Sequence, residues 1–203
     1  MLLIGQYDSP FVRRVAVTMT HYGIAFERDV LSVFGNFEDV LKFNPLGRVP
    51  ALRLDDGEMI VDSQMILDHL DLEVGPERAL TPPDGAARRA VLRRTTVALG
   101  AVEKAIALRG ELYRRREGSQ DDSIVARLRT QIASALSWLE KQVASPWFET
   151  DMRQDDIASA VVVTFLMKKP PYLLDPTSYP RLAMLAATAE ALSAFRAAPF
   201  EAD

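Results

Sequence analysis

Short hydrophobic runs separated by turn residues predict a small sheet in the first third of the chain. The apolar run at residues 2–4 is typical of a buried strand, and residues 26–33 alternate well enough for a second strand. Residues 51–54 and 58–61 flank an Asp-Asp-Gly turn, which is a hairpin signal. The pattern therefore predicts four strands.

Apolar residues at helical spacing lie between these strands and after them. Ser9 followed by Pro10 predicts a helix start, because serine caps helices and proline suits the first helical position. Gly23 predicts the end of that helix. A short helix is expected at residues 37–43, and Ser63 is expected to cap a third helix. This order of strands and helices predicts a mixed sheet covered by helices.

Strand signals stop at a stretch of breaker residues, which is typical of a linker. Beyond it, helical periodicity predicts long helices at residues 86–116 and 124–143. Residues 157–166 are apolar nearly all round, which predicts a central buried helix, and a shorter helix is expected at 181–192. The chain is expected to divide into an α/β domain, a linker and an all-α domain (residues 1–75, 76–85 and 86–203).

Composition narrows the possible functions. The 203 residues are 48% hydrophobic, and the formal charge of −4 argues against a general affinity for nucleic acid or anionic membranes. The chain has no cysteine and two histidines, His21 and His69, which excludes disulfides and zinc–thiolate sites and makes a metal centre unexpected. The start lacks a signal-peptide pattern, and no apolar stretch approaches the ~20 residues that span a bilayer, so a soluble, cytoplasmic protein is expected.

The stretch from Asn44 to Leu52 places a Val-Pro pair at the start of an expected strand. Proline donates no backbone hydrogen bond, so at such a place it stands first in the strand or follows a cis bond in a tight turn. A cis Val49–Pro50 bond would leave the Val49 amide and carbonyl unpaired, and an extended peptide could pair with them. The alternative is a proline-rich loop between helix and strand.

Three motifs stand in order along the chain: YDSPFVRRV at residues 7–15, NPLGRVPAL at 44–52 and DSQMI at 62–66. In this order and spacing, followed by an all-helical second half, they resemble the motifs of bacterial glutathione S-transferases. The likeness covers essentially the whole chain. It implies a thioredoxin-like α/β N-terminal domain and an all-α C-terminal domain, which together make the glutathione transferase fold.

The resemblance also implies a site for glutathione as co-substrate, without a metal. Val49, beside a cis Pro50, would pair its backbone with the cysteinyl unit. Ser63 and the amides at its helix start would hold the γ-glutamyl carboxylate, and Asp62 would face the γ-glutamyl amine. Arg48 is placed to reach the glycyl carboxylate. A plain helix cap is the alternative role for Asp62 and Ser63.

The thiol of glutathione needs activation, because a free cysteine is mostly protonated at neutral pH. Ser9 matches the serine with which the family stabilises the thiolate at the start of its first helix, and it is the expected catalytic residue. Capping that helix is its alternative role. Tyr7 is the rival donor, since other classes of the family use a tyrosine near the end of the first strand, although packing suits it better. With no cysteine at either position, a protein–glutathione mixed disulfide is excluded.

One position departs from the family pattern. Arg153 stands where a serine or threonine usually caps the buried central helix. Asp151, Asp155 or Asp156 is therefore expected to cap that helix in another way. The departure concerns where the helix begins and leaves the expected fold unchanged.

The resemblance places the second-substrate pocket on the first long helix of the all-α domain and on the C-terminal tail. Leu108, Leu112 and Tyr113, together with Tyr7, offer mostly apolar surface, so an apolar electrophile is expected. The implied function is conjugation of the glutathione thiolate to that electrophile, typical of detoxification, by a symmetric homodimer. Two alternatives stay open: a glutathione-dependent isomerase, and a catalytically silent module of this fold that binds proteins.

Overall fold

The computed structural model describes residues 1–116, 118–143 and 152–201. The chain forms two compact units. The first comprises Met1–Arg88 together with Glu190–Asp203, and the second comprises Arg89–Ala189. The C-terminal segment therefore belongs to the same unit as the beginning of the chain.

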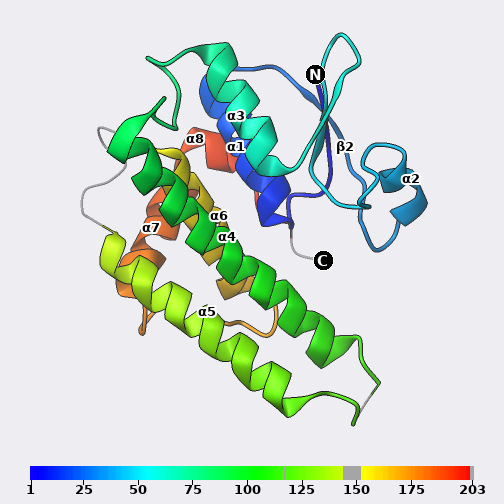
Figure 1. The fold of residues 1–203 in the computed structure, drawn as a ribbon, viewed down its shortest axis with the longest axis vertical. Helices are drawn as coiled ribbons and strands as arrows, with labels where there is room; N and C mark the ends of the chain where they lie inside the picture. Colours follow the sequence, from blue (N-terminus) through cyan, green and yellow to red (C-terminus); the bar gives the residue numbers. More distant parts are fainter. Residues whose placement is uncertain (117, 144–151, 202–203) are drawn as a thin grey trace. The chain divides into compact units, whose positions relative to one another are not determined.

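A four-stranded mixed sheet forms the centre of the first unit (Figure 1). In chain order its strands are β1 (Leu2–Ile4), β2 (Glu27–Asp29), β3 (Ala51–Arg53) and β4 (Met59–Val61). Their spatial order is β2-β1-β3-β4; β1 is parallel to β2 and antiparallel to β3, and β3 and β4 form the predicted hairpin. β2 is shorter than predicted, because its partner β1 offers only three residues for pairing.

Helices complete the first unit: α1 (Pro10–Tyr22), α2 (Phe37–Leu41), α3 (Ser63–Val74) and α8 (Ser193–Ala197). α1 begins after Ser9 and ends at Gly23, whose φ of 72° is left-handed, as the capping residues predicted. α1 packs against β1, α3 and α8. In Figure 1, α1 and α3 lie on one side of the strands and α2 lies on the other. This layering confirms the predicted α/β arrangement.

The described part of the second unit contains helices and no strand: α4 (Gly85–Tyr113), α5 (Asp122–Gln142), α6 (Gln154–Lys168) and α7 (Pro180–Glu190). The first residues of α4 belong to the first unit. α4 and α5 are antiparallel neighbours, since Arg93 lies 4.9 Å over the Trp138 ring near one end and Glu111 bonds to Asp121 near the other. α6 is buried almost all round, which confirms the prediction from its apolar sequence. None of the helices among the described residues has the length and apolar character needed to cross a membrane.

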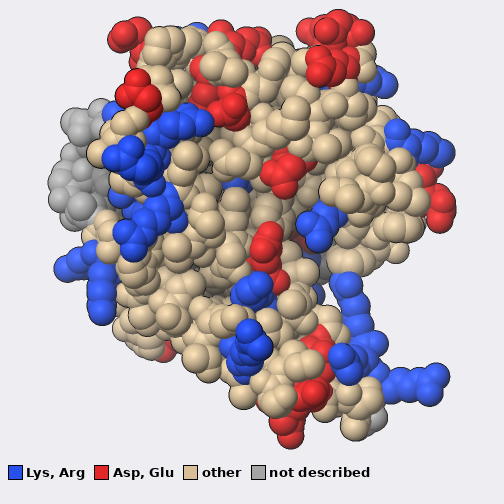
Figure 2. All heavy atoms as spheres, in the orientation of Figure 1, with Lys and Arg blue, Asp and Glu red and all other residues tan. Residues whose placement is uncertain are grey.

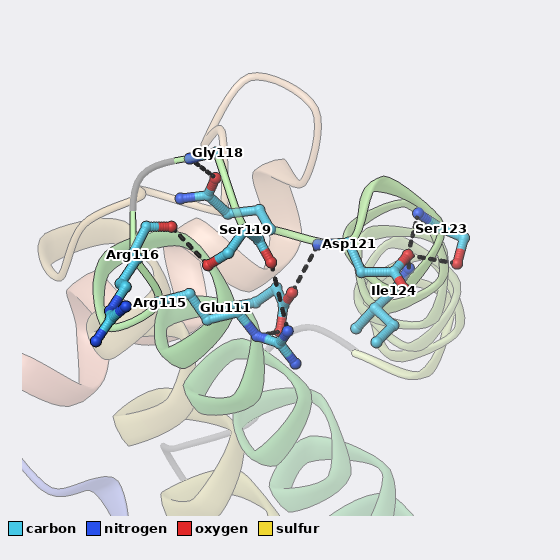
Figure 3. Close-up of polar contacts among 9 residues, drawn as sticks. Glu111, Arg115, Arg116, Gly118, Ser119, Asp121, Ser123 and Ile124 are labelled. Atoms are coloured by element: carbon cyan, nitrogen blue, oxygen red, sulfur yellow. Dashed lines mark hydrogen bonds and ion pairs between the residues drawn. The ribbon is translucent and has the colours of Figure 1, made fainter.

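A buried carboxylate organises the connection between α4 and α5 (Figure 3). Glu111 is 7% exposed; one of its oxygens accepts the Asp121 N–H at 2.8 Å, and the other pairs with Arg115 at 2.8 Å. Asp121 in turn caps α5 by accepting the N–H groups of Ser123 and Ile124. One side chain thus links the end of α4 to the start of α5.

The start of α6 shows how a helix begins without the usual serine or threonine. Arg153 is the N-cap residue, and the Asp156 carboxylate accepts the Arg153 N–H at 2.8 Å, the half of a capping box that an acidic residue supplies. Asp155 is buried instead and forms an ion pair with Arg94 of α4. Burial raises the pKa of Asp155, and the pairing with Arg94 opposes that rise. Asp151, the third candidate, lies outside the described residues.

Candidate functional site

Three loops meet at one end of the sheet because of the way the strands pair. Ala51, at the start of β3, lies opposite Ile4 and Val61, the last residues of β1 and β4. The segments that leave β1, enter β3 and leave β4 therefore lie at the same sheet end. These segments carry the residues that the sequence proposed for catalysis and glutathione binding: Ser9, Arg48, Val49, Pro50, Asp62 and Ser63.

Gly5 lets the first two of these segments approach closely. Its φ is 134°, and a Cβ at this position would lie 2.5 Å from Val12 Cγ2 and 3.0 Å from Val49 Cβ. Such distances exclude any side chain unless its neighbours move. The missing side chain therefore allows Val49 to lie beside the first turn of α1, which Ser9 precedes.

The segment before β3 leaves a peptide group available for pairing. The Val49–Pro50 bond is cis, which confirms the prediction. Asn44 is 2% exposed and holds the preceding turn: its amide donates to the Arg48 carbonyl at 2.9 Å, and its Oδ1 accepts the Leu46 N–H at 2.9 Å. Within the described residues, neither the amide nor the carbonyl of Val49 makes a hydrogen bond. Both groups are therefore available to an extended peptide.

Asp62 caps α3, and the prediction that Ser63 would cap it is wrong. Asp62 has a φ of 70°, uncommon for a residue other than glycine, and its carboxylate accepts the Gln64 N–H at 2.7 Å. Ser63 is already the first helical residue, one position past the place from which a side chain caps. Ser63 is 2% exposed, and its hydroxyl has no hydrogen-bond partner among the described residues. The hydroxyl is therefore available at the positive end of a helix, where anions bind.

A buried arginine that the sequence analysis missed lies beneath this turn. Arg14, on α1, is 0% exposed; its Nη2 donates to Gln64 Oε1 at 3.3 Å, while Nε and Nη1 have no partner in the described part of the chain. Burial lowers the pKa of Arg14 to about 10, although attraction to Asp62 and Asp71 opposes the shift. Arg14 therefore carries a positive charge close to the start of α3. The only signal in the sequence was a pair of arginines, Arg13 and Arg14, inside a largely apolar helix.

Ser9 caps α1 and still has a proton to donate. Its Oγ accepts the Val12 N–H at 3.4 Å, which is long for such a bond. A hydroxyl that accepts through a lone pair keeps its O–H for another acceptor. Capping and donation to a thiolate are therefore compatible roles for Ser9.

Tyr7, the rival donor, is packed. It is 7% exposed, and the Arg28 guanidinium lies 3.8 Å from the centre of its ring. Burial raises the pKa of Tyr7, with Arg28 opposing the rise and Glu201 adding to it. The phenol therefore stays protonated at neutral pH, and its contacts support a packing role.

The residues proposed for the second substrate differ in exposure. Leu108 is buried on α4, Leu112 is half-buried, and Tyr113 is 59% exposed with Arg109 lying 5.8 Å from its ring. Tyr7 belongs to the first unit and the other three to the second. Their role in a pocket stays a prediction.

Charged and metal-ligating side chains are the other groups from which a site could be built. On the face seen in Figure 2, basic side chains form several separate groups with acidic side chains between them, which is typical of a solvated surface. Among the residues that the structure describes, no group of histidine and acidic side chains could hold a metal ion. The candidate site consists of the three loops and of Arg14, buried beneath one of them.

Known proteins resemble this chain in both sequence and fold. Residues 3–78 match the family described as glutathione S-transferase, N-terminal domain. Over 168 residues the chain is 31% identical to the uncharacterized GST-like protein YibF of Escherichia coli (strain K12), covering 82% of each protein. The chain belongs to the glutathione S-transferase family.

Two solved bacterial glutathione S-transferases resemble it over nearly their whole length. The structure from Methylobacillus flagellatus KT, with glutathione bound, is 28% identical with a TM-score of 0.87 and covers 97% of this chain and 98% of its own. The structure from Methylobacterium radiotolerans JCM 2831, in complex with glutathione sulfonate, is 27% identical with a TM-score of 0.90. The match covers 100% of this chain and 96% of the Methylobacterium chain. These similarities confirm the predicted fold class: a thioredoxin-like N-terminal domain and a mostly helical C-terminal part, as in other glutathione S-transferases.

Proposed function

We propose that this chain is a glutathione transferase that joins the glutathione thiolate to a small apolar electrophile. The observation that carries the proposal is the meeting of three groups at one sheet end: the unpaired Val49 peptide, the start of α3 with Ser63, and the Ser9 hydroxyl. Glutathione and glutathione sulfonate in the two similar structures support the same ligand here.

The proposed complex uses the peptide nature of glutathione. Its cysteinyl backbone pairs with the amide and carbonyl of Val49, beside the cis Pro50, as a short added strand. This pairing sets the direction of the bound peptide and brings its sulfur toward the first turn of α1. Arg48 is exposed, and the structure records no ion pair for it among the described residues, so it is suited to the glycyl carboxylate.

The γ-glutamyl end of glutathione meets the start of α3. Its carboxylate accepts hydrogen bonds from the Ser63 hydroxyl and the helix amides, and both the helix dipole and the buried charge of Arg14 favour the anion. Asp62 uses one carboxylate oxygen to cap the helix, which leaves the other for the γ-glutamyl amine.

Catalysis in this proposal is stabilisation of a thiolate. The Ser9 hydroxyl donates to the sulfur near the positive end of α1, which lowers the thiol pKa, and the thiol proton goes to solvent. The thiolate then attacks the electrophile, a carbon–sulfur bond forms and the leaving group departs with the electron pair of its broken bond. Leu108, Leu112 and Tyr113 are the proposed contacts for the electrophile.

A glutathione titration followed by an activity assay tests the function. We expect glutathione to raise the melting temperature in a concentration-dependent way, and a generic aryl halide to be conjugated. An isomerase would bind glutathione without conjugating it to the substrate. Product analysis would then recover glutathione unchanged together with an isomer of the substrate. No thermal shift with glutathione would contradict the proposal and favour a protein-binding module.

The proposal includes a homodimer in the cytoplasm. Two large apolar side chains of α3 are exposed, Met65 at 56% and Leu72 at 77%, and their spacing of seven residues places them on the same face of the helix. An isologous contact would cover α3 of each protomer with α4 of its partner. The cytoplasm is proposed because it maintains the reduced glutathione pool that the reaction needs.

A further inference from the structure

The C-terminal tail is bound to the loop that carries Ser9. Glu201 accepts the Tyr7 N–H at 3.0 Å through Oε2, across 194 positions of sequence, and pairs with Arg28 Nη1 at 2.8 Å through Oε1. Arg28 in turn covers the Tyr7 ring. One carboxylate near the end of the chain therefore holds the backbone of Tyr7 directly and its side chain through Arg28.

The loop that Glu201 holds leads directly into the first helix. The Ser9 N–H donates to the Gln6 carbonyl at 3.2 Å, which closes a tight turn over residues 6–9. Tyr7 is the second residue of that turn, and its N–H points to Glu201. The closing bond lies at the upper end of the usual distance range, and the charge-assisted bond from the Tyr7 N–H to Glu201 gives the same turn a second attachment.

The tail is anchored a few residues before Glu201. Arg13 on α1 is 1% exposed; it binds Glu190 through two hydrogen bonds of 2.7 Å and donates from Nε to the Ala198 carbonyl at 2.8 Å. Its guanidinium also lies 5.6 Å from the centre of the Phe195 ring. Ala198 is therefore fixed on α1, which limits how far Glu201 can move from Tyr7.

We infer that Glu201 is a positioning residue for Ser9: it fixes the turn that presents the Ser9 hydroxyl to the sulfur of bound glutathione. The inference rests on the proposed function of Ser9. It adds a residue from the end of the chain to a proposed glutathione site that is otherwise built from the first 64 residues. No motif marks Glu201, which is one of 28 acidic residues in the sequence.

Removing Glu201 has two opposite effects on the glutathione thiol. A loosened turn weakens the hydrogen bond from Ser9, which raises the thiol pKa. The lost negative charge leaves Arg28 unpaired, and an unpaired cation nearby lowers the thiol pKa. The direction of the shift therefore distinguishes positioning from simple electrostatics.

The test compares Glu201→Ala and Glu201→Gln with a matched control, Asp68→Asn, in the full chain. Asp68 pairs with Arg88 at 2.9 Å in the same unit, so the control removes a similar ion pair. We expect Glu201→Ala to raise the thiol pKa of bound glutathione by about half a unit to one unit, measured by the absorbance of the thiolate. We also expect it to lower kcat roughly three- to tenfold, with KM for the aryl halide nearly unchanged. Glu201→Gln keeps an acceptor for the Tyr7 N–H and should retain most of the activity, and Asp68→Asn should match the wild type.

A lowered or unchanged thiol pKa in folded Glu201→Ala overturns the inference. Amide hydrogen exchange gives a readout that needs no glutathione: the Tyr7 N–H should exchange about tenfold faster in Glu201→Ala and at the wild-type rate in Asp68→Asn. If the wild type binds no glutathione, the proposed function fails, while faster Tyr7 exchange in Glu201→Ala still supports a turn held by Glu201. Equal Tyr7 exchange rates in wild type and Glu201→Ala would show that Glu201 does not hold the turn.

Discussion

At the scale of single residues, the chemistry of the site depends on which hydrogen bonds its hydroxyl groups already make. Ser9 accepts one weak bond from Val12 and keeps its proton. Ser63 makes none among the described residues, because Asp62 supplies the cap of α3. The two serines are therefore expected to differ in function, one acting on the thiol and the other on a carboxylate.

Replacing Ser9 with alanine tests its catalytic role. We expect Ser9→Ala to raise the thiol pKa of bound glutathione by about one unit and to lower turnover about tenfold, since a hydrogen bond to the thiolate is lost. Glutathione affinity should change little, and Ser9→Thr, which keeps the hydroxyl, should retain most of the activity. An identical thiol pKa in Ser9→Ala and wild type, measured by spectroscopic titration, would leave Ser9 as a helix cap only.

Ser63→Ala is expected to weaken glutathione binding more than Ser9→Ala does. The hydroxyl meets a charged carboxylate, and such bonds contribute about 1.5–3 kcal/mol, or roughly a 10- to 150-fold change in Kd. Calorimetric titration measures this change. The melting temperature without ligand should stay near that of the wild type, because Asp62 caps the helix. Equal dissociation constants for wild type and Ser63→Ala would contradict the assignment.

At the scale of elements, a buried network joins α1 and α3 to the segment that follows them. Tyr22 is 5% exposed; its hydroxyl donates to Asp71 of α3 and accepts the Leu80 N–H at 2.7 Å. Asp71 also accepts the Thr81 N–H at 3.2 Å, and Arg78 donates to the Tyr22 carbonyl at 2.6 Å. The ends of both helices are thus held to one stretch of chain.

Tyr22→Phe should destabilise the protein by about 2–3 kcal/mol, because Asp71 loses a donor and the Leu80 N–H loses its acceptor in a buried place. Urea unfolding measures the loss, with the exposed Tyr172→Phe as control, for which a change below about 0.5 kcal/mol is expected. Equal unfolding midpoints for the two variants would contradict the network.

The same tyrosine predicts a loss of stability at high pH. Burial, followed by the hydrogen bond to Asp71, raises the pKa of Tyr22 above its ordinary value of 10.0. A raised tyrosine pKa means that the folded state favours the neutral phenol, so this stability is present below about pH 10 and is lost as the pH rises further. The unfolding free energy of the wild type should therefore fall more steeply above pH 10 than that of Tyr22→Phe.

The α4–α5 connection gives a test in the second unit (Figure 3). Glu111→Ala leaves the Asp121 N–H without its acceptor and Arg115 without its partner, so we expect a loss of about 1–3 kcal/mol in unfolding free energy. Glu103→Ala, at an exposed position of the same helix, is the control. Faster amide exchange at Asp121 should accompany the loss. Unchanged exchange there would show that Glu111 does not hold the connection.

At the scale of the whole molecule, the exposed apolar side chains of α3 predict self-association. Sedimentation of the wild type should give a species of twice the 22.6 kDa chain mass. Met65→Glu combined with Leu72→Glu should give the chain mass, because two charges per protomer would be buried in the contact. Met184→Glu, at an exposed position of α7, should leave the dimer intact. A wild type that sediments at the chain mass at every concentration would contradict the dimer.

Local features were predictable because they depend on neighbouring residues. The β1 run and the capping of α1 by Ser9 and Gly23 each follow from a few adjacent side chains and appear where the sequence placed them. The cis bond before Pro50, also confirmed, was predicted from the family motif together with the place of the proline at a strand start. The cap of α3 shows the limit of this reasoning. Asp62 and Ser63 are both good caps, and only the backbone conformation decided that the helix begins one residue earlier than predicted.

Contacts between distant parts of the chain were decided by the tertiary structure alone. Arg14 and its neighbour Arg13 stand inside a largely apolar helix, but the sequence does not show that Arg14 is fully buried, because its burial depends on where the chain packs around α1. Glu201 reaches Tyr7 only because α8 returns the chain end to α1. The sequence by itself determined the elements, the order of the three site loops and their chemistry. Which buried charges surround those loops depends on packing across almost the entire chain length, and no local pattern encodes it.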